Sequence, residues 1–222
     1  MKRLTVNETE LIARATATAW LRGMMAARLD ETLWAEGFTR PTKSIGYTRK
    51  IDEGKQRIDF DLIMRPRYAK DAVQLTLFTS LLLPEVGAKA ADLRGEPFVR
   101  RKHELVQREL LGTLVRNPPI MTFRTPAELD AHAPTIEGYL RTGVLPHLDA
   151  RRTVRAFAEP KAALIDKFGG NDGQWGAEPV VVAAAFLVLG EPERAKQLLV
   201  TAYPPDSPSR PRYQHVLDTV GC

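Results

Sequence analysis

Apolar and polar residues alternate in the stretch from Arg57 to Arg65. The apolar positions are Ile58, Phe60, Leu62 and Met64. This period of two is typical of a strand with one buried face and one solvated face. Apolar runs at 45–51 and 73–83 flank the stretch, and turn-forming residues such as Asp52-Glu53-Gly54 separate the runs. The pattern therefore predicts a three-stranded antiparallel meander.

A long helix is expected before the meander. Asn7 is a suitable N-cap, Glu10 completes a capping box, and Gly37 followed by Pro41 marks the end of the helix. The apolar positions of the expected core-facing stripe are Ile12, Ala15, Ala19, Ala26, Leu29 and Leu33. We expect this helix to bury its stripe by lying across one face of the sheet.

The segment 103–115 allows two interpretations. Its leucines fit the stripe of an amphipathic helix, but the even-numbered residues from Val106 to Leu114 also fall on one side of a strand. Gly112 is unfavourable inside a helix, and Asn117-Pro118-Pro119 follows shortly after it. We therefore prefer a fourth strand and keep the helix as the alternative.

Helical signals dominate the second half of the chain. Thr125-Pro126-Ala127-Glu128 is a capping box with proline at the first helical position. These signals predict an α+β fold: a long N-terminal helix packed on a three- or four-stranded antiparallel sheet, followed by a helical C-terminal half. We expect a helix-plus-sheet part over 1–125 and a helical part over 126–203, together forming one compact domain. The proline-rich residues 204–222 are expected to form an extended tail.

Composition excludes several classes of protein. The chain has 222 residues, of which 44% are hydrophobic and 27% charged, so it can bury an ordinary globular core. Its one cysteine is Cys222, which excludes internal disulfides and cysteine-based metal cages. No apolar run is long enough to span a bilayer, and no signal peptide is evident. These features predict a cytoplasmic protein with no membrane association.

Few residues suggest catalysis. Asp59 and Asp61 share one face of the central predicted strand and are candidates for acid–base work or cation binding, although solvated surface pairs are the more common explanation. His147 is the histidine most suited to a role, but helix capping or packing also explains it. The four histidines are scattered and lack metal-ligand spacing. We therefore predict no catalytic residue, no metal and no cofactor, and keep Asp59, Asp61 and His147 as the candidates for catalysis.

Two kinds of basic string are candidates for binding. Arg65-Pro66-Arg67-Tyr68 recurs as Arg210-Pro211-Arg212-Tyr213, and arginine beside tyrosine can contact bases or an acidic protein surface. The one basic cluster is Arg100-Arg101-Lys102. The formal charge of +5 is otherwise spread along the chain, which disfavours a dedicated nucleic-acid-binding surface. The predicted binding residues are Arg65, Arg67, Tyr68, Arg100, Arg101 and Lys102.

The order of short motifs over about residues 20–200 resembles the bacterial domain of unknown function numbered 4304. The motifs are Glu36-Gly37-Phe38, a strand carrying Tyr47, Ile58-Asp59-Phe60-Asp61, Leu110-Leu111-Gly112-Thr113-Leu114, and Gly143-Val144-Leu145-Pro146-His147-Leu148-Asp149. The chain departs from the family pattern at 119–123, where an aromatic pair is expected. The resemblance supports the fold class and implies no activity.

These observations favour a non-catalytic protein-binding role in a bacterial cell. The partner would be another protein, and one concrete form is an immunity or antitoxin protein that masks a toxin. One alternative is an enzyme acting on a nucleotide or nucleic acid through Asp59 and Asp61. A second alternative is a nucleic-acid-binding module. The sequence does not predict the oligomeric state.

Overall fold

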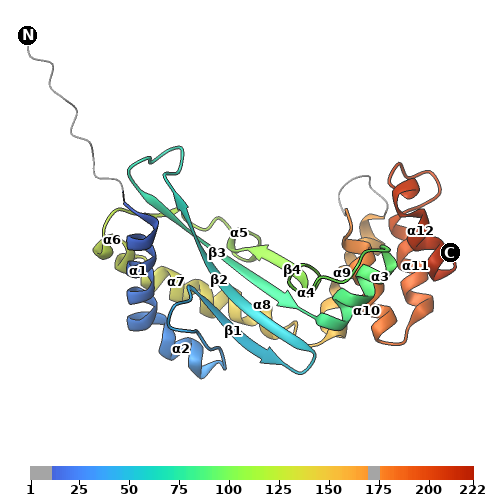
Figure 1. Cartoon of the computed structure of the whole chain (residues 1–222), viewed down its shortest axis with the longest axis horizontal. Coiled ribbons are helices and arrows are strands. Elements are labelled where there is room, and N and C mark those ends of the chain that lie inside the picture. The colour runs from blue at the N-terminus through green and yellow to red at the C-terminus, as the bar shows by residue number, and fades with distance from the viewer. Residues whose placement is uncertain (1–11, 170–175) are drawn as a thin grey trace, which may run out of the picture. The chain divides into compact units, whose positions relative to one another are not determined.

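The fold is known from a computed structural model that describes residues 12–169 and 176–222 (Figure 1). The expected N-cap Asn7 and its partner Glu10 lie outside the described residues. Among the described residues, no helix is both long and apolar enough to cross a membrane.

The N-terminal helical segment consists of three pieces. Helix α1 (Arg14–Met24) continues into a π-helical turn, η1 (Met25–Leu29), and then into α2 (Asp30–Ala35). The segment ends as expected at Gly37, which has a positive φ of 80°. Met24 is buried, and the other buried apolar positions recur every four residues: Ala17, Leu21, Met25, Leu29 and Leu33. The expected stripe was therefore right at its last two positions and wrong at Ala15, Ala19 and Ala26, which are exposed.

The sheet has five strands within the described part of the chain. They are β1 (Gly46–Ile51), β2 (Gly54–Met64), β3 (Val73–Leu82), β4 (Leu105–Leu110) and β5 (Met121–Phe123). The strand order is β1-β2-β3-β4, and β5 pairs antiparallel with the start of β3 so that Val73 faces Phe123. In β2 the apolar residues from Ile58 to Leu62 are buried, which confirms the strand predicted from the alternation.

The class α+β with an antiparallel sheet is confirmed, but the expected arrangement is not matched. The N-terminal helical segment is divided, and a sheet of five strands rather than three or four follows it. The segment 103–115 contains both structures that were considered for it. Strand β4 occupies its middle, and the short helix α5 (Leu111–Leu114) follows directly.

The remaining helices lie after β3. They are α3 (Pro84–Leu93), α4 (Arg100–His103), α6 (Pro126–Ala131), α7 (Ala133–Tyr139), the π-helical η2 (Leu140–Val144), α8 (Leu145–Asp149), α9 (Val154–Phe168), α10 (Glu178–Val188), α11 (Pro192–Ala202) and α12 (Arg210–Val220). Thr125 caps α6 by accepting a hydrogen bond from the Glu128 N–H, as the capping box predicted.

The chain divides by its contacts into two interleaved units. Unit 1 comprises residues 12–49, 57–79 and 109–146, and unit 2 comprises 50–56, 80–108, 147–169 and 176–222. The long strands contribute residues to both units, so this division does not follow the expected boundary at residue 125.

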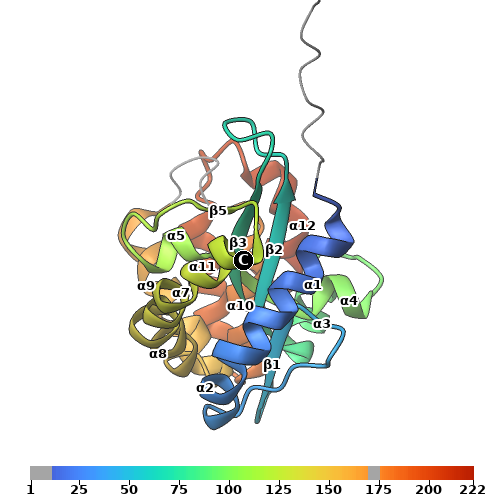
Figure 2. The same cartoon turned by 90° about the vertical axis from the view of Figure 1, so that its left-hand side faces the viewer.

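Unit 1 contains the N-terminal helical segment, and Figure 2 looks onto its helices α1 and α2. Nη2 of Arg14 on α1 donates a hydrogen bond of 2.8 Å to the Leu62 carbonyl of β2. On the same helix, the Trp20 ring makes an edge-to-face contact with Phe123 of β5, with ring centroids 6.4 Å apart. These contacts bring α1 and two strands of the sheet into one core.

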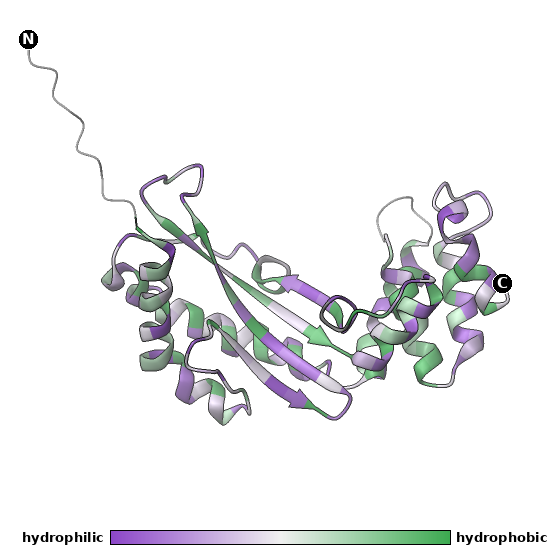
Figure 3. Ribbon diagram, in the orientation of Figure 1, coloured by the Kyte–Doolittle hydropathy of each residue, from purple (hydrophilic) through white to green (hydrophobic). Residues whose placement is uncertain are grey.

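Unit 2 has a helical core in which α10 is central. Helix α10 contacts α3, α9 and α11, and its residues Val182–Phe186 are almost completely buried. The hydropathy colouring of Figure 3 shows the apolar character of this helix. A helix that is apolar on all sides is stable only when neighbours cover it all round.

The predicted extended tail is wrong. Residues 210–220 form helix α12, on which Tyr213, Val216 and Leu217 are buried against the core of unit 2. Pro211 lies in the first helical turn, where a missing N–H costs nothing because that donor has no partner within the helix. The prolines therefore delimit a helix rather than prevent one.

Candidate functional site

A hollow of about 400 Å³ in unit 2 is the strongest candidate for a functional site. This volume lies within the usual range of ligand sites. Its charged and imidazole-bearing lining residues are Arg94, Glu96, Lys102, His103, Arg212 and His215. Its other lining residues are Gly87, Ala90, Leu105, Val106, Ala177, Val181 and Tyr213. We call this hollow the basic pocket.

Close packing of α3 against α4 brings two walls of the pocket together. A Cβ atom on Gly87 would lie 1.9 Å from the carbonyl oxygen of His103, so only glycine allows this approach. Ala90 continues the same wall, and Arg94 follows the end of α3. The small residues of α3 thus form one wall of the pocket, and the basic side chain of Arg94 lies at the end of this wall.

Glu96 is the one acidic side chain among the described residues that line the pocket. It accepts a hydrogen bond of 2.8 Å from Nζ of Lys102 and contacts Nε2 of His103 at 3.2 Å. Nε of Arg94 lies 3.4 Å from its other oxygen. The Lys102 hydrogen bond has the largest effect on the pKa of Glu96 and lowers it. Desolvation opposes this effect, but the His103 hydrogen bond and the charge of Arg94 add to it, so the pKa lies below its ordinary value.

The hydrogen bonds of His103 define its tautomer. The side chain is only 2% exposed, and its Nδ1 accepts a hydrogen bond of 2.8 Å from the Val99 N–H. Nδ1 must therefore carry the lone pair, so Nε2 carries the proton and donates it to Glu96. Both ring nitrogens are engaged in the same loop, and His103 consequently positions Glu96 rather than offering a base.

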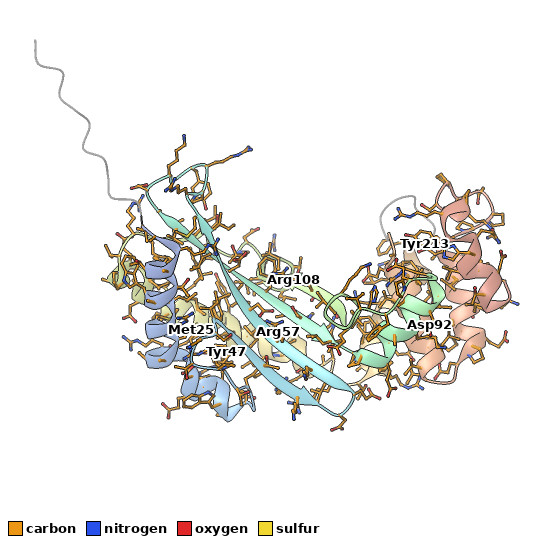
Figure 4. The ribbon with its side chains drawn as sticks, viewed as in Figure 1. Met25, Tyr47, Arg57, Asp92, Arg108 and Tyr213 are labelled. Atoms are coloured by element: carbon orange, nitrogen blue, oxygen red, sulfur yellow. The ribbon has the colours of Figure 1, made fainter. Side chains whose placement is uncertain are left out.

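Helix α12 supplies the opposite wall. Arg212 and His215 are both exposed and lie three residues apart, on one face of the helix. Tyr213, labelled in Figure 4, is buried and stacks on Tyr203 with ring centroids 4.4 Å apart. Nη1 of Arg210 donates a hydrogen bond of 2.7 Å to the Tyr203 carbonyl. These contacts fix the start of α12 and with it the position of Arg212.

The pocket carries an excess of positive charge. Three basic side chains, those of Arg94, Lys102 and Arg212, face the single carboxylate of Glu96 among the described lining residues. Clefts lined by one sign of charge concentrate ligands of the opposite sign. The arrangement is therefore suited to an anionic group.

The structure brings together two of the basic strings singled out in the sequence. Lys102, from the cluster Arg100-Arg101-Lys102 in α4, and Arg212, from the second Arg-Pro-Arg-Tyr string, line the same pocket. Arg94, Glu96 and the two histidines of the pocket were missed. Their positions show no motif, because the site joins segments more than a hundred residues apart.

The first Arg-Pro-Arg-Tyr string lies elsewhere, in the turn between β2 and β3 of unit 1. Arg65, Arg67 and Tyr68 are exposed there, and Arg65 has a positive φ of 57°. The Tyr68 hydroxyl donates a hydrogen bond of 2.8 Å to the Gln74 side chain. The first copy is a hairpin turn and the second begins a helix, so the two copies are not a structural repeat.

The carboxylates of β2 have local partners. Asp59 is partly buried and pairs with Nη2 of Arg57 at 2.6 Å, while the exposed Asp61 accepts a hydrogen bond from the Leu62 N–H. In the described part of the chain, no group of three or more potential metal ligands was found. His147 lies in α8, and its carbonyl accepts a hydrogen bond from Arg151. Asp59 and Asp61 belong to unit 1, whereas His147 belongs to unit 2.

A second polar cluster is buried in unit 1. Asp30 of α2 pairs with Nη2 of Arg40 at 2.6 Å and accepts a hydrogen bond of 2.7 Å from the Tyr47 hydroxyl. Burial opposes ionisation of Asp30, but the hydrogen bonds from Arg40 and Tyr47 prevail and lower its pKa. Burial, with a further contribution from the Asp30 bond, raises the pKa of Tyr47 far above its ordinary value. We regard this cluster as structural because it fixes α2 to β1.

Comparisons with known proteins gave no match: no family model, no curated protein and no solved structure is significantly similar to the chain. The resemblance to the domain of unknown function 4304 therefore stays a prediction.

Proposed function

We propose that this protein is a non-catalytic binding protein that recognises an acidic segment of another protein at the basic pocket. The observation that carries the proposal is the convergence of Arg94, Lys102 and Arg212 from three separate elements on one hollow. Glu96, the single carboxylate among the described residues of that hollow, is already hydrogen-bonded to Lys102 and His103. An incoming anion would therefore meet uncompensated positive charge.

The apolar surface beside the pocket supports a protein as the partner. Phe98, Val99 and the lining residue Leu105 are 45%, 52% and 39% exposed. Exposed apolar side chains next to arginine are typical of protein-binding surfaces, where the apolar residues supply contact area and the arginines supply specificity. A nucleic-acid site would instead extend its positive charge along a face or groove.

The bonding of His103 suits a positioning role for this residue rather than the role of a general base. A general base needs a nitrogen lone pair that faces the substrate. The lone pair of His103 on Nδ1 already accepts the Val99 N–H. One concrete form of the proposal is an immunity or antitoxin protein that masks a toxin, and the toxin would then present the acidic segment.

The proposal is tested with a fluorescein-labelled peptide of alternating glutamate and valine, titrated with the full chain and followed by fluorescence anisotropy. We expect salt-sensitive binding that Lys102→Glu combined with Arg212→Glu weakens by about tenfold or more, because reversed charges at an interface repel the ligand. Both residues are exposed, so the fold should tolerate the change.

The matched control is Arg67→Glu combined with Lys70→Glu in the β2–β3 turn, where both residues are also exposed. It changes the net charge by the same amount and should leave the affinity within about twofold, apart from weak long-range effects. Equal losses in the two double variants, or no binding by the wild type, would refute the pocket as the recognition site.

A further inference from the structure

The charge of the basic pocket fits a doubly charged anion better than a singly charged one. Arg94, Lys102 and Arg212 outnumber Glu96 by two charges among the described lining residues. A carboxylate carries one negative charge, whereas a phosphate monoester carries about 1.5 to 2 at pH 7. Of these two groups, only the phosphate monoester nearly neutralises the two excess positive charges of the pocket.

The donors of the pocket also match the acceptors of a phosphate. Arg94 and Arg212 present planar guanidinium groups from two walls, and such groups bind phosphate oxygens in pairs. The Arg94 side chain is only 19% exposed, so little freedom is lost when it binds. Its Nε is buried and, in the described part of the chain, has no partner with hydrogen-bond geometry. The remaining donors of this guanidinium are available to a ligand.

Lys102 and His215 are two further hydrogen-bond donors that line the pocket. Lys102 uses one of its three donors on Glu96, and its side chain is 66% exposed, so this ion pair is weak enough to be shared with a ligand. His215 is exposed on the same face of α12 as Arg212 and can donate from either neutral tautomer. Four side chains can therefore donate to one group that has three terminal oxygens.

We propose that the anchor recognised by the basic pocket is a phosphate monoester, carried by a phosphorylated side chain of the partner protein. This inference rests on the proposed function and names the chemistry of its ligand. The exposed Phe98 and Val99 beside the pocket favour a phosphorylated polypeptide over a free phosphorylated metabolite, because only a polypeptide has neighbouring side chains to cover them. The partner segment would thus carry apolar residues next to its phosphorylated residue.

The test compares three labelled peptides that differ at one position, which holds phosphoserine, glutamate or serine between apolar neighbours. We expect the full chain to bind the phosphoserine peptide about tenfold more tightly than the glutamate peptide, and the serine peptide least. Inorganic phosphate should compete with the phosphoserine peptide. A single-stranded oligonucleotide, which carries phosphodiesters of one charge each, should compete poorly.

The variant that tests donor geometry is Arg212→Lys, which keeps the charge but removes the planar fork. Arg212 is exposed, so the variant should fold normally. We expect it to lose most of the preference for phosphoserine over glutamate while still binding the glutamate peptide. Arg94→Lys should act in the same direction, with a thermal melt to confirm that the pocket wall is intact.

The outcomes separate the two proposals. Equal affinity for the phosphoserine and glutamate peptides would overturn the phosphate inference and leave the proposed function standing. Failure of every peptide to bind would overturn both. Tighter binding of the oligonucleotide than of the phosphoserine peptide would replace the protein partner with a nucleic acid.

Discussion

Nε2 of His103 donates a hydrogen bond to Oε2 of Glu96 across 3.2 Å, and the same carboxylate oxygen accepts a hydrogen bond from Lys102. A buried neutral imidazole thus holds Glu96 next to Lys102, whose side chain is 66% exposed. Glu96 limits the positive potential of the pocket and at the same time orients Lys102. Removal of its negative charge should therefore change the affinity of the pocket for an acidic ligand.

Glu96→Gln should strengthen the binding of an acidic peptide. The amide keeps the shape of the side chain and removes a negative charge close to the ligand, which should improve the affinity by about three- to tenfold at low salt. The measurement is the anisotropy titration in wild type and variant. Asp92→Asn is the control, because Asp92, labelled in Figure 4, is exposed on α3 and is not one of the residues that line the pocket. A weaker affinity in Glu96→Gln would mean that Glu96 contributes to the site by positioning alone.

Asp30→Ala should destabilise the fold strongly. Asp30 and Arg40 form an ion pair of 2.6 Å with side chains 9% and 5% exposed, so removing the acid leaves a buried arginine without its counter-charge. We expect a loss of about 3–5 kcal/mol in the free energy of unfolding, measured with urea. Asp71→Ala is the matched control, because Asp71 pairs with Arg124 over the same 2.6 Å but both side chains are 46% exposed. Its effect should be far smaller, and similar effects of the two variants would contradict the structural role of the buried cluster.

The contribution of Asp30 should disappear in acid. Its pKa in the folded state is lowered below the ordinary value of 3.8, so its stabilising effect is fully present above that value and is lost as the pH falls through the lower folded-state value. The difference in unfolding free energy between wild type and Asp30→Ala should hence be constant above about pH 5 and shrink towards about pH 3. Urea titrations across this range measure it. A difference that grows in acid would mean that the folded-state pKa is raised.

Phe60→Ala tests the strand on which the sequence interpretation began. Phe60 is 3% exposed, and its ring lies edge-to-face against Tyr47 with centroids 6.5 Å apart. We expect a cost of about 3–5 kcal/mol, the usual range for a buried phenylalanine. Ile63→Ala on the same strand is the control, since Ile63 is 44% exposed and its loss should cost about 0.5 kcal/mol or less. If the melting temperature of Phe60→Ala were the same as that of the wild type, the central position of β2 in the core would be contradicted.

Local patterns in the sequence predicted local structure well. The alternation around Phe60 gave β2, and the capping residue Thr125 marked the start of α6, because both signals depend on neighbours within a few residues. The π-helical turn Met25–Leu29 could not be anticipated. It adds a residue to one turn, so the apolar stripe expected for a regular helix is out of phase with the buried positions Ala17 and Leu21 before the turn.

Helix α12 was missed for a different reason. The density of prolines around it predicts an extended chain, although Tyr213, Val216 and Leu217 show helical spacing. The basic pocket could be predicted only in part. Lys102 and Arg212 were visible as members of basic strings, but their meeting depends on how α3, α4, α10 and α12 pack. No periodic pattern encodes a contact between segments so far apart in the chain.

The central claim is that an acidic ligand binds at the basic pocket, and amide chemical shifts test it most directly. The full chain, labelled with ¹⁵N, is titrated with the phosphoserine peptide. We expect the largest changes at Arg94–Glu96, at Lys102 and His103, and along Arg212–His215. Largest changes at Arg65–Tyr68 in the β2–β3 turn or around Asp59 and Asp61, with the pocket signals unmoved, would contradict the claim.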